Sequence, residues 1–199
     1  MNENYRGRGP QRILPPPQAE EETKEEQGMR FAVEMPYPEL TGIARNTQNA
    51  RLLSALFAGA HGELTACTQY VQHGMVLGNL GQAGAEVLQG VAVCEMRHLK
   101  LLGEMILRCG GRAAYCDWQR RAVWNGRMVQ YAREARRIWQ ADILGERAAI
   151  AAYRWTRERV NDLCIVEAID RILLDEELHL RLFQEQAAMA RGEACTVTE

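Results

Sequence analysis

Cysteine pairs with the spacing CxxC, which often bind structural zinc, are missing from this sequence. Its six cysteines occur singly and mostly on apolar stripes, so we expect reduced core thiols in a cytoplasmic protein. Apolar runs near the roughly 20 residues of a membrane span are also missing, and no segment has the pattern of a signal peptide. We therefore expect no membrane partner.

The chain also has no surplus of charge of either sign. Its 24 basic and 26 acidic residues give a net charge of −2, and the arginines are interspersed with acidic residues. This mixture is typical of a solvated surface and lacks the basic patch that nucleic-acid binding needs. We expect no nucleic-acid partner. Hydrophobic residues make up 47% of the 199 residues, enough for one domain with a substantial core.

Composition divides the chain into four parts. Residues 1–28 combine prolines with an acidic run and are predicted to form a disordered polar tail. Residues 29–45 contain "MPYPEL" and are predicted to be an extended lead-in that drapes over the domain. Residues 46–190 have helical periodicity, and residues 191–199 are predicted to be a flexible C-terminus.

The helical part predicts four helices, at about 46–77, 82–109, 134–159 and 161–190. The short links within the first and the second pair predict two antiparallel hairpins. The connection at 110–133 is long, and a helix of 28 residues is about 42 Å long, so this segment can run the length of a bundle. Hairpin, crossover and hairpin predict an all-α, ferritin-like four-helix bundle.

Each predicted helix carries a glutamate near the middle of its apolar stripe, and the second and fourth helices add a histidine three residues later. These six residues are Glu63, Glu95, His98, Glu146, Glu176 and His179. Because the stripes face the core, the six side chains are predicted to meet at one height inside the bundle.

Four carboxylates in a core would repel one another, and each would lose several kcal/mol of hydration. With two neutral imidazoles the cluster would carry four negative charges, which two divalent cations would cancel. Carboxylate and imidazole ligands without thiolate suit iron or manganese better than a closed zinc site. The sequence therefore predicts a dinuclear centre of two iron or two manganese ions.

The segments "GELTACTQY", "CEMRHLK", "DILGERAAIAAY" and "DEELHLRLF" resemble the dinuclear carboxylate helix bundles, which include bacterioferritins, rubrerythrins and manganese catalases. The resemblance covers about residues 46–190. It implies that Glu63 and Glu146 are terminal ligands and that Glu95 and Glu176 bridge the two metals. Each of the two histidines would bind one metal.

The resemblance also implies hydrogen-bond partners for the histidines. Asp175 matches the position at which bacterioferritin-like proteins place an acceptor for the other motif's histidine, here His98. The equivalent position before Glu95 is Cys94, which departs from that pattern. The sequence therefore indicates no partner for His179.

Other residues near the stripes are open to several interpretations. Tyr70 and Tyr153 each follow a terminal glutamate by seven residues, and they could hydrogen-bond the ligands, act as redox-active phenols or fill the seam. His61 and His73 are expected to point away from the stripe, toward the surface or an interface. Met96 matches the haem-binding position of bacterioferritins, but we expect it to pack rather than to bind haem.

The resemblance implies chemistry on H2O2 or O2. Positions at which this sequence differs from each subfamily narrow the range of expected reactions. Rubrerythrins carry a further glutamate where this chain has Ala149, and the chain has no CxxC electron-transfer module, so a peroxidase would need an external electron donor. Manganese catalases often lack the carboxylate at Glu176. The segments "VWNGRMVQY" and "MPYPEL" nevertheless resemble manganese-catalase-related and ferritin-like proteins of spore-forming bacteria. We expect catalase-like or peroxidase-like redox detoxification.

Two alternatives remain open. One is a ferroxidase and iron-storage protein, which requires a hollow shell of many subunits. The other is a structural coat or assembly component with a vestigial site, although a discarded site has no physical reason to keep four buried carboxylates. We expect the chain to form a homo-oligomer.

Overall fold

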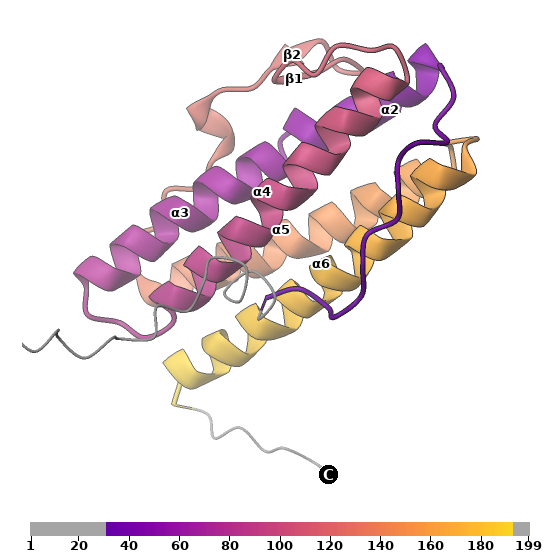
Figure 1. The fold of residues 1–199 in the computed structure, drawn as a ribbon. Coiled ribbons are helices and arrows are strands. Elements are labelled where there is room, and N and C mark those ends of the chain that lie inside the picture. Colours follow the sequence, from indigo (N-terminus) through magenta and orange to yellow (C-terminus); the bar gives the residue numbers. More distant parts are fainter. Residues whose placement is uncertain (1–30, 193–199) are drawn as a thin grey trace, which may run out of the picture.

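The computed structural model describes residues 31–192 as an all-α four-helix bundle (Figure 1). The elements in chain order are α2 (Thr47–Ala58), α3 (Glu63–Asn79), α4 (Ala85–Arg108), β1 (Cys116–Asp117), β2 (Ala122–Val123), the 3₁₀ turn η1 (Gly126–Met128), α5 (Ala135–Arg157) and α6 (Leu163–Ala190). The tail predicted at residues 1–28 and most of the predicted C-terminus lie outside the described residues.

The helices form two hairpins joined by a crossover. α3 packs mainly against α4, and α5 mainly against α6. The crossover between α4 and α5 contains β1 and β2, which pair antiparallel with Cys116 opposite Val123. The indole N–H of Trp124 donates to Thr65 Oγ1 at 3.0 Å, which attaches this segment to α3. The predicted order of hairpin, crossover and hairpin is confirmed.

The predicted first helix is interrupted, because α2 ends at Ala58 and α3 begins at Glu63. A Cβ atom at Gly59 would collide with the carbonyl group of Ala55, and one at Gly62 would collide with the carbonyl of Leu56. The turn therefore needs glycine at both positions. It places Glu63 in the first turn of a new helix, where the helix dipole favours a negative charge.

Residues 31–46, here named the N-terminal strap, lie along α6 in the direction opposite to that helix (Figure 1). The guanidinium group of Arg171 donates to the carbonyl oxygens of Val33 and Met35 at 2.7 and 2.8 Å. The ring of Phe31 packs directly against Gly90, in the space that the Cβ atom of any other residue at position 90 would occupy. The strap thus covers the side of the bundle formed by α4 and α6.

The apolar core consists of two clusters, which lie one after the other along the bundle axis. One cluster contains Leu53, Leu102 and Ile169, and the other contains Leu88, Trp139 and Phe183. Polar residues from the middle of the helices are buried between them. No helix within residues 31–192 has both the length and the hydropathy that crossing a membrane requires.

Candidate metal centre

The middle of the bundle contains the six acidic and imidazole side chains that the sequence predicted to meet. α3 contributes one glutamate, α5 contributes another, and α4 and α6 contribute a glutamate and a histidine each. Their exposed fractions are at most 3%: Glu63, Glu95, His98, Glu146, Glu176 and His179. The predicted convergence in space is therefore present in the structure.

The six residues form two overlapping groups, each with ligand-type atoms within 4.8 Å of one another. The first group is Glu63, Glu95, His98 and Glu176, and the second is Glu95, Glu146, Glu176 and His179. Glu95 and Glu176 belong to both groups, whereas Glu63 and Glu146 belong to one each. The bridging roles of Glu95 and Glu176 and the terminal roles of Glu63 and Glu146, which the family resemblance implies, stay predictions.

Both histidines turn the same ring nitrogen toward the cluster. His98 Nδ1 lies 2.9 Å from Glu95 Oε2 and 3.1 Å from Glu176 Oε1. His179 Nδ1 lies 2.9 Å from Glu95 Oε1. Glu95 thus contacts both imidazoles, and each histidine lies in a group with both Glu95 and Glu176.

Several buried atoms of the cluster have no hydrogen-bond partner, although such atoms are rare in proteins. Within residues 31–192, four of the seven unpartnered buried side-chain atoms belong to it: Glu95 Oε1, Glu146 Oε2, Glu176 Oε1 and His179 Nδ1. None of the four has a hydrogen bond, although His179 Nδ1 and Glu95 Oε1 lie 2.9 Å apart. Hard cations between them would satisfy all four, so the residues fit a pair of divalent metal ions.

The electrostatics of the cluster also indicates that it needs bound cations. Burial, followed by the charges of Glu95 and Glu176, raises the pKa of Glu63 well above its usual range. The same causes raise the pKa of Glu146. Burial is the largest single influence on Glu95 and would raise its pKa, but the charges and hydrogen bonds of His179 and His98 together outweigh burial and hold the pKa of that carboxyl low. The terminal glutamates therefore need positive charge beside them to stay ionised.

Two tyrosines hold the terminal glutamates from inside the bundle. Tyr70 of α3 donates to Glu146 Oε1 at 2.5 Å, and Tyr153 of α5 donates to Glu63 Oε1. Burial and the adjoining carboxylates raise the pKa of both phenols well above the usual range, so both stay protonated donors. Of the interpretations left open by the sequence, hydrogen bonding to the glutamates is the one observed.

On the outer side of His98, Asp175 is the partner that the family resemblance indicated. His98 Nε2 lies 3.1 Å from Asp175 Oδ2, and Arg171 and the backbone N–H of Val33 hold the other oxygen of Asp175. The hydroxyl of Tyr37 donates to Asp175 Oδ2 at 2.5 Å and lies 3.1 Å from His98 Nε2. Tyr37 belongs to the N-terminal strap and was not predicted as a site residue.

The partner of His179 also comes from the N-terminal strap. His179 Nε2 lies 2.9 Å from the backbone carbonyl oxygen of Phe31, which accepts its N–H. A backbone acceptor has no signature in a sequence. Cys94, which occupies the position of the expected side-chain acceptor, lies 3.6 Å from His98 Nε2 and also interacts with His179. The strap therefore orients both histidines.

The expectation for His73 was wrong, because this histidine is fully buried rather than at the surface. Its ring nitrogens lie 2.8 Å from Asp142 Oδ1 and 2.6 Å from the backbone oxygen of Gln130. α3 has a second inward stripe, which faces α5 and the crossover. Met96 is 52% exposed on α4 in the single chain, and its expected packing stays a prediction.

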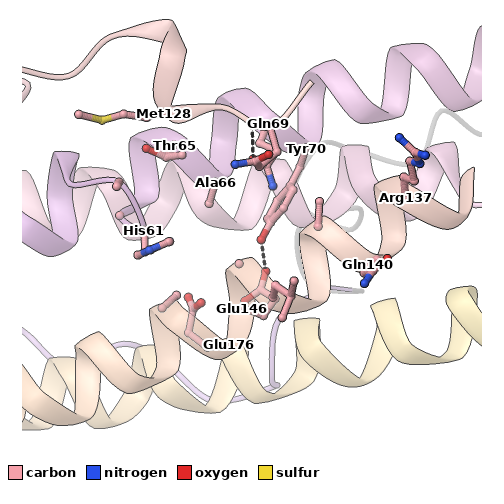
Figure 2. Close-up of a pocket in the computed structure, with 17 residues that line it drawn as sticks. His61, Thr65, Ala66, Gln69, Tyr70, Met128, Arg137, Gln140, Glu146 and Glu176 are labelled. Atoms are coloured by element: carbon pink, nitrogen blue, oxygen red, sulfur yellow. Dashed lines mark hydrogen bonds between the residues drawn. The ribbon is translucent and has the colours of Figure 1, made fainter. Parts of the chain in front are cut away.

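A cavity of about 380 Å³ leads to the cluster between α3 and α5 (Figure 2). Glu146 and Glu176 line its inner end, and Tyr70 extends across it from α3 to reach Glu146. His61 lies at its rim and is exposed, as expected. The α3–α5 side thus gives access to the cluster, while the N-terminal strap closes the opposite side.

The chain has a ferritin-like fold. Comparison with models of protein families gave no match, and comparison with curated protein sequences gave none either. Two structures of KatB, a manganese catalase from Anabaena, are similar, with TM-scores of 0.69 and 0.67. Each is 23% identical over 83% of this chain and 84% of KatB. A structure of Rhodobacter capsulatus bacterioferritin with a metal-free dinuclear site and haem iron is also similar, with a TM-score of 0.64. The two sequences are 21% identical over 75% of this chain and 89% of the bacterioferritin chain.

Proposed function

We propose that the protein binds two iron or two manganese ions and acts on peroxide or dioxygen. The observation that carries this proposal is the pair of overlapping groups, in which two shared carboxylates lie between two sets of one glutamate and one histidine. Glu63 and His98 would hold one ion, Glu146 and His179 would hold the other, and both shared glutamates would contact both ions. When bound, such a pair of ions supplies two-electron redox chemistry.

The protein's own groups prepare the site for small oxygen compounds. The hydroxyls of Tyr70 and Tyr153 fix one oxygen of each terminal glutamate. The other oxygen of Glu146, Oε2, is buried without a hydrogen-bond partner and so is free to bind a cation. The apolar clusters on either side exclude water along the bundle axis. The cavity between α3 and α5 provides the route by which a substrate reaches Glu146 and Glu176.

Catalase-like or peroxidase-like turnover of H2O2 is the activity that we propose first. The similarity to a manganese catalase over most of both chains supports it. Ferroxidase activity is the second candidate, supported by the similarity to a bacterioferritin. The five cysteines in the described part are free and mostly buried, which supports the reducing, cytoplasmic compartment expected from the sequence.

The test is to load the purified protein with Mn(II) or Fe(II) and to measure O2 evolution from H2O2 and, separately, oxidation of Fe(II) by O2. Glu176→Gln keeps the shape but removes the charge of a shared ligand, so we expect it to abolish turnover. Glu185→Gln, at an exposed position on the same helix, is the matched control. Equal activity of the two variants would contradict the proposed centre.

Particle mass by light scattering separates the two candidates. An iron store needs a closed shell of many subunits, whereas a catalase or peroxidase does not. A metal-loaded protein that is inert toward both H2O2 and Fe(II) with O2 would favour the structural alternative instead.

A further inference from the structure

The cavity beside the cluster is larger than peroxide or dioxygen requires. A water molecule occupies about 30 Å³ of liquid, and H2O2 has only two heavy atoms. At about 380 Å³ the cavity belongs instead to the size class of sites that enclose organic ligands, which starts near 300 Å³. Its volume exists because small residues from α3, α5 and the link between α2 and α3 face one another: Ala60, Gly62, Ala66, Ala141, Gly145 and Ala149.

This cavity is distinct from the space between the six ligand-type residues. Of those six, only Glu146 and Glu176 line it, and both belong to the group that includes His179. Glu63 and His98 do not line it. The cavity therefore adjoins one of the two predicted metal positions from outside, where a substrate could contact an ion without displacing the ligands.

The lining selects for a neutral, apolar body. Alanine side chains, Met128 and Leu144 form much of the wall, and His61, Gln140 and Arg137 lie at its two outer ends (Figure 2). The remaining polar side chains of the wall are uncharged: Thr65, Gln69, Tyr70 and Gln130. Glu146 and Glu176 are the carboxylates at the inner end, and two divalent cations would balance the charge of the cluster to which they belong. An uncharged group at the inner end leaves that balance unchanged.

We propose that the cavity binds an organic hydroperoxide, with its apolar body against the alanines and its O–O group toward Glu146 and Glu176. The proposal rests on the proposed peroxide chemistry and names a substrate class for it. The O–O bond of ROOH breaks, and with two electrons and two protons it yields ROH and water. H2O2 supplies those electrons and protons as it is oxidised to O2, so that ROOH and H2O2 give ROH, H2O and O2.

Binding can be measured without turnover by using cumyl alcohol, the product expected from cumene hydroperoxide. Calorimetric titration of the metal-free and the metal-loaded protein should show one site for cumyl alcohol. Ala149→Leu places a larger side chain in the cavity and should weaken binding about tenfold or more. Ala151→Leu, exposed on the same helix, is the control and should bind like the unaltered protein.

Ala66→Leu fills the cavity from the opposite wall, and we expect the same loss of binding. It provides a second test if Ala149→Leu loses its helical circular dichroism. In the metal-loaded protein, both cavity variants should lower the ratio of cumene hydroperoxide consumption to H2O2 consumption.

The outcomes separate this inference from the proposed function. A protein that consumes H2O2 but binds no cumyl alcohol, or whose cavity and control variants bind it equally, would overturn the hydroperoxide site alone. Binding of cumyl alcohol in the cavity by a metal-loaded protein that consumes neither peroxide would overturn the peroxide chemistry, and the hydroperoxide assignment with it.

Discussion

The hydroxyl of Tyr37 links the N-terminal strap to the metal centre, and Tyr37→Phe removes that single group. The ring stays in place because Arg171 lies 4.3 Å from its centroid and Arg97 lies 5.7 Å from it. What is lost is the hydrogen bond of 2.5 Å to Asp175, together with the contact to His98 Nε2. A hydrogen bond to a charged group contributes about 1.5–3 kcal/mol.

Two magnitudes follow from this loss. Asp175 keeps its bonds to Arg171 and to the backbone N–H of Val33, so we expect about 2 kcal/mol of lost stability, within that range. For a chain of this size this lowers Tm by about 4–8 °C. Loss of an outer partner of a metal-binding histidine typically weakens metal affinity about 10–100-fold, and we expect about tenfold because Asp175 remains.

Thermal unfolding of the metal-free protein measures the change in Tm, and chelator competition with Mn(II) measures the change in metal affinity. Only one of the two ions should weaken, the one beside His98, because the partner of His179 is unchanged. Tyr115→Phe, at an exposed tyrosine that stacks on Phe57, is the matched control. If the two variants have the same Tm and the same metal affinities, the strap does not orient the ligand.

Three further changes test other parts of the centre. Glu95→Ala removes a carboxylate common to both groups, so metal content by elemental analysis should fall for both ions; an unchanged stoichiometry would refute a bridging role. His98→Ala should cost one ion while circular dichroism still shows a helical bundle, and complete loss of helix would instead make the cluster essential for folding. Gly90→Leu puts a side chain where the Phe31 ring lies, so limited proteolysis should cut the strap faster than in the unaltered protein, and equal rates would argue against tight docking.

A pH dependence follows from the same electrostatics. Burial and neighbouring carboxylates raise the pKa of Glu63 and Glu146, so the metal-free protein holds protons that a cation must displace. Lowering the pH favours the protonated forms, and the affinity for Mn(II) should therefore fall as the pH falls. Chelator competition across a pH series measures this, and an affinity independent of pH would contradict the assignment.

The bundle and its six central residues could be predicted because each depends on a periodic pattern. The ends of α4, α5 and α6 lie within three residues of their predicted positions. A glutamate on an apolar stripe, such as Glu146, is costly to bury unless its charge is neutralised. Four such glutamates at the same height of the bundle therefore point to bound cations. The break before Glu63 was missed because a single glycine is tolerated in a helix, whereas here Gly59 and Gly62 act together.

The groups that the sequence did not reveal come from segments without periodicity or from a second stripe. The Phe31 carbonyl could not be assigned because every residue has one, and Tyr37 lies in an extended segment whose register on α6 depends on tertiary contacts. The two prolines around Tyr37 in "MPYPEL" were the available signal. His73 was misplaced because α3 buries two faces, one toward the cluster and one toward Asp142.

We infer that paired cations neutralise the buried carboxylates that four helices bring together at the centre of this protein. Elemental analysis of the protein purified from its native host tests that claim most directly. We predict two ions of iron or manganese per folded chain. A folded, fully helical protein that contains neither metal, and takes up neither when Fe(II) or Mn(II) is added, would contradict it.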